Sequence, residues 1–298
     1  ATLAGHRVLT DPGFYCYNGE PDWEVHFRKT AAHNTIAIDG LDQARHVSKM
    51  AWTRTYVPRL EGHSAGDAIG WVTGSHDGFQ RQARDVVHRR TAWLRPDGYL
   101  VVCDEIISRG EHLARANYQF GPGSLVLDKS GDAALFAGRF ALSWSCSVPV
   151  TATLVQGGDG PDGGWIAPSL GVRVRAPRVS LEFPVRPGRV VLLTILSDRA
   201  RCVGGVSFAA PQSVSDHPVL GARIAGDTWQ DVLVAGTDGR HHGMLGMETD
   251  ASLVVRRVDG RGDEKEAVRI GGTFLRARTP AATPAPTGEH GSMAAARS

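Results

Sequence analysis

Polar and charged side chains crowd residues 23–40, WEVHFRKTAAHNTIAIDG, at the entrance to an alternating apolar run. A β-protein that needed only a loop there would more simply use Gly, Pro, Asp and Ser, which supply turn geometry directly. Arg28 carries a planar fork of N–H donors that matches a carboxylate or a sulfate. His33 and Asn34 follow with an imidazole and an amide. The segment therefore predicts a binding or catalytic site.

These residue types also have structural interpretations. Arg28 could instead form a salt bridge with a nearby carboxylate, Asp22, Glu24 or Asp39. An asparagine at the start of a strand, such as Asn34, is more often a turn residue.

Three aromatic and acidic residues upstream are further candidates. Tyr15 and Tyr17 in GFYCYNG could contact the face or the hydroxyls of a sugar ring, and the alternative for both is cross-strand packing. Asp11 opens an Asp-Pro-Gly tripeptide, which is a common turn. His33, taken alone, would most often be a hydrogen-bonded loop residue.

Composition and charge exclude several classes of function. The chain has 298 residues, of which 42% are apolar and 21% charged, as in an ordinary globular protein with a sizeable core. Its 33 basic and 31 acidic residues are interspersed, so no basic stripe could follow a nucleic acid or an anionic membrane. No apolar run approaches the roughly 18 residues of a spanning helix. We therefore expect neither a nucleic acid nor a membrane as partner.

Short runs of Val, Leu, Ile, Thr and aromatic residues recur between Gly, Pro and Asp turns, for example in RRTAWLRPDGYLVVCDEI and RVVLLTIL. Such runs predict strands, and the turns RPDGY, KSGDA and TDGRH favour antiparallel hairpins. No segment keeps a 3.6-residue period over three turns, which argues against helical crossovers and a parallel sheet. The sequence predicts an all-β fold, a large antiparallel β-sandwich with several sheets, over residues 1–275.

Residues 276–298 are rich in Pro, Ala, Thr and Ser and nearly free of large apolar side chains, so they predict a flexible tail. The cysteines are scattered and form no CxxC pair. We expect structural thiols, with one disulfide as the alternative. The four cysteines are Cys16, Cys103, Cys146 and Cys202.

The order of motifs resembles the heparinase II/III family of polysaccharide lyases. DPG, YNG, FRKTAAHNT and DGLDQ carry the resemblance near the start, and HDG, VVHRR, DEI and GEH support it farther along. The likeness extends to about residue 275 and implies the C-terminal β-sandwich domain of that family. It also implies that a helical toroid domain precedes this chain in a longer protein.

The resemblance implies cleavage of an acidic, uronate-containing polysaccharide, a glycosaminoglycan or alginate, by β-elimination. That reaction needs a group that neutralises the uronate carboxylate, a base for the C5 proton and an acid for the departing O4. In the family, the tyrosine and one histidine that serve these steps lie upstream of the DPG turn. We therefore expect no catalytic residue in this chain, and little or no lyase activity from it alone. The alternative is a non-catalytic carbohydrate-binding or scaffold β-sandwich.

The family also implies roles for individual residues. Relatives that bind zinc use the DPG aspartate, the AHN histidine and an upstream histidine, which maps two ligands onto Asp11 and His33 and leaves the third outside this chain. For substrate contacts, the candidates remain those chosen above for their chemistry: Arg28, Asn34, Tyr15 and Tyr17. A periplasmic or secreted location follows from the resemblance alone.

Overall fold

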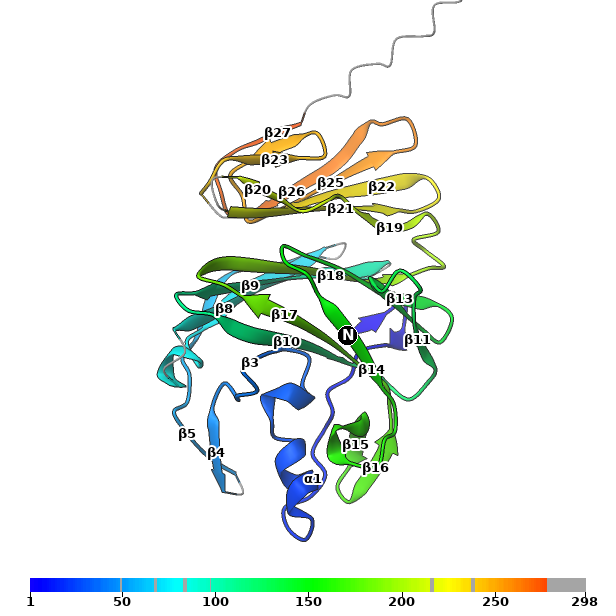
Figure 1. Cartoon of the computed structure of the whole chain (residues 1–298). Coiled ribbons are helices and arrows are strands. Elements are labelled where there is room, and N and C mark those ends of the chain that lie inside the picture. The colour runs from blue at the N-terminus through cyan, green and yellow to red at the C-terminus, as the bar shows by residue number, and fades with distance from the viewer. Residues whose placement is uncertain are drawn as a thin grey trace, which may run out of the picture.

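The computed structural model describes residues 1–277 except residues 49, 67–68, 83–84, 97, 215–216 and 237–238. Figure 1 shows a stack of β-sheets, and the paired strands of these sheets are antiparallel. The expected all-β, multi-sheet antiparallel fold is confirmed. The predicted tail, residues 276–298, lies outside the described residues from residue 278 onward.

Two sheets form the lower half of the stack. The four-stranded sheet has the order β14 (Thr151–Val155), β17 (Arg178–Val185), β10 (His112–Gln119) and β3 (Ile36–Ile38). The eight-stranded sheet above it has the order β11 (Leu125–Leu127), β12 (Ala133–Phe136), β13 (Phe140–Cys146), β18 (Gly188–Asp198), β9 (Tyr99–Ser108), β8 (Val86–Arg95), β7 (Gly70–His76) and β6 (Pro58–Ala65).

Two further sheets continue the stack upward: the first covers the upper face of the eight-stranded sheet, and the second covers the outer face of the first (Figure 1). One has the order β19 (Gly205–Phe208), β21 (His217–Ala225), β22 (Trp229–Ala235), β25 (Leu253–Asp259) and β26 (Glu264–Ile270), with β20 (Gln212–Val214) also paired to β21. The other has the order β23 (His242–Met244), β24 (Met247–Thr249) and β27 (Leu275–Ala277).

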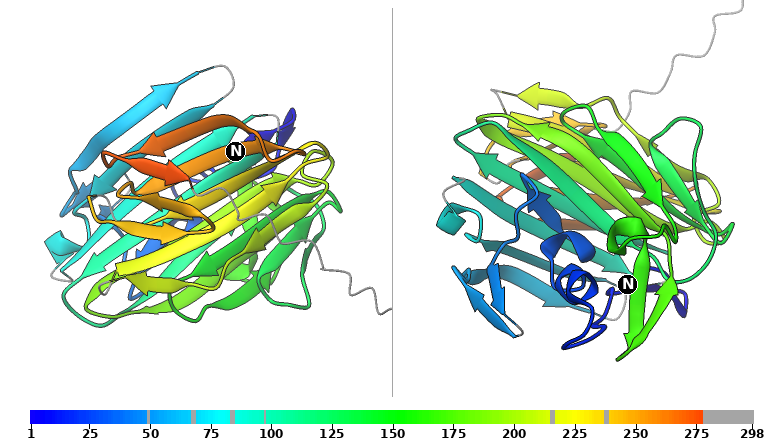
Figure 2. Two further views of the ribbon diagram at one scale, coloured as in Figure 1. Left: turned by 90° about the horizontal axis from the view of Figure 1, so that it is seen from above. Right: turned by 60° about the horizontal axis from the view of Figure 1, so that its bottom comes forward.

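Short elements lie at the open end below the four-stranded sheet, as both views from the side and from below show (Figures 1 and 2). They are the hairpins β4–β5 (Arg45–Ser48, Ala51–Thr53) and β15–β16 (Trp165–Ser169, Val172–Arg175), the helix α1 (Pro21–His26) and the 3-10 turns η1 (Thr30–Ala32) and η3 (Pro161–Gly163). The pair β1–β2 (Thr2–Leu3, His6–Arg7) and the turn η2 (Gln80–Gln82) complete the elements.

The central strands of the eight-stranded sheet, such as β9 and β18, are buried on both faces, which explains their continuous apolar runs. Side chains of adjacent strand residues point to opposite faces. On β18, Leu192 belongs to the core against the four-stranded sheet, with Phe183, while Leu193 belongs to the core against the upper sheets, with Leu233. The run RVVLLTIL therefore contributes side chains to two hydrophobic cores.

Two of the three predicted hairpins are confirmed, and the third is wrong. RPDGY joins β8 to β9 and KSGDA joins β11 to β12. TDGRH does not join paired strands, because β22 hydrogen-bonds to β21 and β25 while β23 pairs with β24. The four cysteines are free thiols, three of them buried, as expected. Among the described residues, no helix has the length and apolarity needed to cross a bilayer.

Candidate functional site

Arg28 is held at the end of α1 by the packing of that helix. Trp23 and Phe27 lie on one side of α1, and their rings stack on each other. Phe27 is also buried against Tyr15. The next residue, Arg28, points to a different side of the helix, where Glu24 lies one turn earlier. Its guanidinium lies over the ring of Phe14, with 5.0 Å between the charged carbon and the ring centroid.

The guanidinium of Arg28 is buried but only partly satisfied. Its side chain is 3% exposed, and one nitrogen, Nη1, donates to Glu24. Among the described residues, Nε and Nη2 have no hydrogen-bond partner. A buried donor without a partner destabilises a fold unless a ligand or water satisfies it. Arg28 thus keeps two N–H directions available for an anion, in addition to the predicted salt bridge to Glu24.

The structure brings His33 and Asp11 together. Nδ1 of His33 lies 2.8 Å from Oδ2 of Asp11, and Oδ1 of Asp11 accepts from the Gly13 N–H at 2.9 Å. The first contact lowers the pKa of the Asp11 carboxyl. Asp11 is therefore both the turn former of Asp-Pro-Gly and the group that orients the imidazole. Nε2 of His33 has no partner among the described residues and remains for another ligand.

Gly13 is required at this turn for a steric reason. Its φ is +83°, and a Cβ added there would lie 2.1 Å from the carbonyl oxygen of Ala167. The loop is thereby pressed against β15, where Ala167 donates its N–H to the Pro12 carbonyl oxygen at 2.6 Å.

Arg28 and His33 line one pocket of about 500 Å³. Thr30 lies between them, and its hydroxyl accepts from the Gln43 N–H at 2.9 Å while its own N–H donates to Asp42 at 2.6 Å. The pocket is lined by Arg28, Thr30, His33, Gln43, Ala44, Trp52, Thr55, Tyr56 and Pro58, and we refer to it as the Arg28 pocket.

The aromatic part of the pocket lining was not predicted from the sequence. Trp52 on β5 and Tyr56 in the segment that follows add two aromatic residues to the same pocket as the cation and the imidazole. Aromatic faces are suited to a sugar ring, and the polar groups fix its orientation. No motif marked these residues, because a tryptophan in a strand pattern is usually a packing residue and the hairpin that carries Trp52 is short.

The other predicted contact residues lie elsewhere. Nδ2 of Asn34 donates to the Thr10 carbonyl oxygen at 2.8 Å, and Oδ1 accepts from the Gln119 N–H at 2.7 Å. This amide joins the start of the chain to β10. Tyr15 is buried and donates its hydroxyl to Glu20. Tyr17 is 50% exposed and packs edge-on against Phe14. These three residues do not line the Arg28 pocket.

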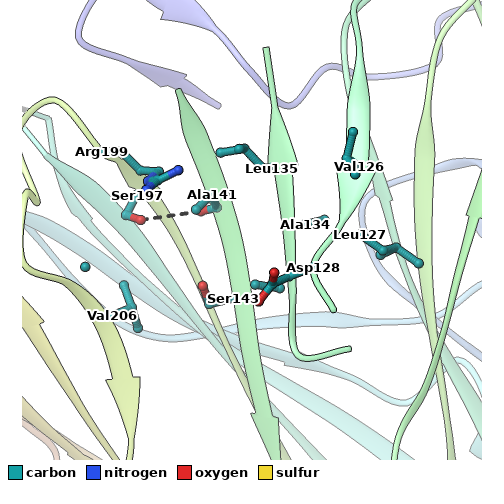
Figure 3. A pocket seen from close by; sticks show the side chains of 12 residues that line it. Val126, Leu127, Asp128, Ala134, Leu135, Ala141, Ser143, Ser197, Arg199 and Val206 are labelled. Atoms are coloured by element: carbon teal, nitrogen blue, oxygen red, sulfur yellow. Dashed lines mark hydrogen bonds between the residues drawn. The ribbon is translucent and has the colours of Figure 1, made fainter. Parts of the chain in front are cut away.

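A second pocket, of about 320 Å³, differs in chemistry (Figure 3). Its floor consists mainly of small residues on β12, β13 and β18, such as Ala134, Ala141 and Ser143, and Ser197 donates to the Ala141 carbonyl oxygen there. The exposed Arg199 is one of its two charged lining residues. Its lining includes no buried, unsatisfied donor from the described residues, so the Arg28 pocket is the better candidate.

A metal at Asp11 and His33 would find suitable but incomplete ligands. Carboxylate and imidazole are ordinary zinc ligands, but a stable site has three or four. The described residues contain no cluster of three or more His, Cys, Asp or Glu side chains that could hold an ion. The two residues thus fit part of a zinc set.

Comparisons with known proteins identify the family of this chain. Residues 2–192 match the family described as "Heparinase II/III-like, C-terminal". A heparin-sulfate lyase from Bacteroides stercoris is 22% identical over 240 residues, which cover 76% of this chain and 30% of that protein. The crystal structure of a heparan sulfate lyase from Pedobacter heparinus aligns with a TM-score of 0.58 at 15% identity, over 81% of this chain and 36% of that one.

A crystal structure of heparinase III aligns with a TM-score of 0.57 at 17% identity, over 77% of this chain and 34% of that one. The chain therefore spans about a third of the length of these relatives. The structural likeness shows a shared fold, and the sequence match covers most of the chain. The chain belongs to the heparinase II/III-like C-terminal family.

Proposed function

We propose that this chain is the β-domain of a lyase that cleaves acidic, uronate-containing polysaccharide by β-elimination, and that the Arg28 pocket binds the acidic sugar. The observation that carries the proposal is the buried guanidinium of Arg28, which has two unsatisfied N–H donors in a pocket with an aromatic wall. A carboxylate or sulfate would satisfy those donors with charge-assisted hydrogen bonds. The relatives named above as heparin or heparan sulfate lyases support such a substrate.

Residues of the Arg28 pocket can support one part of the β-elimination. A base removes the C5 proton, the electrons form a C4=C5 double bond, and O4 leaves with a proton from an acid. The developing negative charge lies beside the uronate carboxylate, so a fixed cation there lowers the barrier. Arg28 supplies that cation in our proposal. The hydrogen bond between Thr30 and Gln43 holds two segments of the pocket lining together. In our proposal, the groups that move the two protons lie outside this chain.

Asp11 and His33 are proposed as two ligands of a zinc site that a further residue completes. A bound zinc would act as a Lewis acid near the substrate. Without an ion, Asp11 orients His33 through the contact at Nδ1, and binding of both side chains to one zinc would replace that contact. Zinc titration of residues 1–298 by calorimetry tests this assignment without an activity assay. We expect weak binding that disappears in His33→Ala, and equal binding by both chains would contradict the assignment.

A helical toroid domain is proposed as the partner within the longer protein, and a periplasmic or secreted location as the setting. Support for a covering partner comes from apolar side chains that lie exposed beside the pocket. Val57 is 49% exposed and Leu60 66%, and Val47 and Met50 on the β4–β5 hairpin are 58% and 59% exposed. Such a cluster usually marks an interaction surface.

An ultraviolet assay for unsaturated uronate ends tests the function. Residues 1–298 joined to their helical domain should release absorbing product from heparan sulfate, and Arg28→Met should reduce kcat/KM strongly. Arg115→Met is the matched control, because Arg115 is an exposed arginine paired with Glu182 on the four-stranded sheet. Residues 1–298 alone should release no product. Binding without product in the joined protein would instead favour a non-catalytic carbohydrate-binding domain.

A further inference from the structure

A buried chain of hydrogen bonds runs behind the Arg28 pocket. His76 on β7 and His88 on β8 are cross-strand partners, and Nε2 of His76 lies 3.2 Å from Nδ1 of His88. Nε2 of His88 lies 2.6 Å from Oδ1 of Asp104 on β9. Arg90 donates to both oxygens of Asp104, from Nε at 2.6 Å and from Nη2 at 3.0 Å. We call His76, His88, Asp104 and Arg90 the cross-wall network.

The donors in this network have fixed directions. The Gly78 N–H donates to Nδ1 of His76 at 3.2 Å, and a main-chain N–H can only donate. Nδ1 of His76 must therefore be the unprotonated nitrogen, so Nε2–H donates to Nδ1 of His88. His88 in turn donates its own Nε2–H to the Asp104 carboxylate. Both imidazoles are thus neutral Nε2–H tautomers.

The charges around the network agree with that assignment. Burial, followed by the neighbouring His88, lowers the pKa of His76 to about 4. Burial alone would raise the pKa of Asp104, but Arg90 and His88 lower it to about 2. The network therefore holds one ion pair, Asp104 with Arg90, and a neutral His76 ring.

The two ends of the network contact two separate segments of the pocket lining, which we call its two walls. At one end, the ring of His76 packs on the ring of Tyr56 with 5.2 Å between centroids, and the adjacent Asp77 accepts from the Val57 N–H at 2.9 Å. At the other end, Nη1 of Arg90 donates to the Asn34 carbonyl oxygen at 2.6 Å, next to His33.

We propose that the cross-wall network sets the separation of the two walls of the Arg28 pocket, which makes His88, its central member, a positioning residue for the ligand. The geometric part of this proposal concerns the ligand-free chain, and only its effect on affinity rests on the proposed function. The network does not act as a proton relay for a substrate, because Nδ1 of His76 is already occupied by the Gly78 N–H.

His88→Phe is the informative substitution. It removes both hydrogen bonds of the ring but leaves the Asp104–Arg90 ion pair intact, so no buried charge is left alone. Tyr99→Phe is the matched control, since it also removes a hydrogen bond to a buried carboxylate, that of Asp231, in the upper core far from the pocket. Arg28→Lys reports separately on whether the pocket binds the ligand.

The experiment uses residues 1–298 and a heparan sulfate tetrasaccharide as probe. In the unsubstituted chain, a long-range proton–nitrogen spectrum of the histidines should show the Nε2–H form for His76 and His88. In His88→Phe, the main-chain amides of Val57 and His33 should exchange faster with solvent. If the variant adopts the binding-competent wall separation for about a tenth of the time, its affinity for the tetrasaccharide should fall about tenfold. Tyr99→Phe should change neither.

Several results would overturn the proposal. An Nδ1–H form of either histidine in the unsubstituted chain would contradict the donor order without the need for any variant. Unchanged exchange at both walls in His88→Phe would show that the network does not set their separation. If Arg28→Lys binds the probe as well as the unsubstituted chain while the exchange results hold, the proposed function fails and the network stands.

Discussion

Acid should destabilise this fold well above the range in which its carboxylates titrate, because two histidines are buried neutral. His26 on α1 has a side chain that is 4% exposed. Burial, together with the nearby Arg178 and Lys29, lowers its pKa from 6.5 to about 4, against a smaller opposing effect of Asp162. The pKa of His76 falls to the same value. Both groups must release a proton on folding below pH 6.5.

The magnitude follows from the two pKa values of each histidine. A pKa that is lower in the folded state means that the unfolded chain binds more protons between about pH 4 and 6.5, so stability decreases as pH falls through that window. One histidine with values of 6.5 and about 4 loses about 2 kcal/mol between pH 7 and pH 5. The two together would lose about 4 kcal/mol, a large part of a typical unfolding free energy of roughly 5–15 kcal/mol.

Urea unfolding at pH 7 and pH 5 measures this loss. His26→Gln cannot titrate, and we expect it to halve the difference between the two pH values. His63→Gln is the control, because His63 lies exposed on the edge strand β6 and should leave the difference unchanged. A free energy that is the same at pH 7 and pH 5, or a loss that His26→Gln leaves intact, would refute the reasoning.

Two other substitutions and one spectroscopic measurement have defined outcomes. Tyr99→Phe removes the hydroxyl that donates to the buried Asp231 carboxylate at 2.5 Å and should lower the unfolding free energy by about 2 kcal/mol in urea, whereas Tyr17→Phe should have no effect. Phe183→Ala would open a cavity between the lower two sheets and should cost about 3–5 kcal/mol in the same assay; a loss below 1 kcal/mol would mean that this core is not packed as described. A far-ultraviolet spectrum of residues 1–298 should be that of a β-protein, and a helical spectrum would contradict the fold.

Hydrophobic alternation and turn residues were sufficient to predict the fold class. The limit appears at strand pairing, where TDGRH has hairpin composition but β22 pairs with β21 and β25. A turn signal is local, whereas partner choice depends on which apolar faces meet in the stack. The eight-residue strand β6 carries no alternating pattern that predicts a strand, because its exposed edge position leaves it without an apolar stripe.

The candidate site also contains residues that the sequence predicted and residues that only the structure shows. Arg28 and His33 were found because a cation and an imidazole interrupt an apolar pattern within six residues of each other. Trp52 and Tyr56 come from a separate segment, residues 51–57, and only the folded chain brings them into the same pocket as Arg28. Asn34 illustrates the converse, since a polar side chain in the motif is fully engaged by the main chain of Thr10 and Gln119.

The Nε–H signal of Arg28 provides the most direct test of the acidic-sugar site. A heparan sulfate tetrasaccharide is titrated into nitrogen-15-labelled residues 1–298, and the signal is assigned by its loss in Arg28→Lys. We predict that this signal shifts and exchanges more slowly with water, because its buried N–H has no partner among the described residues and would gain an anionic one. If the Arg28 signal stays fixed at saturating tetrasaccharide while that of Arg199 at the second pocket moves, the Arg28 pocket is not the site.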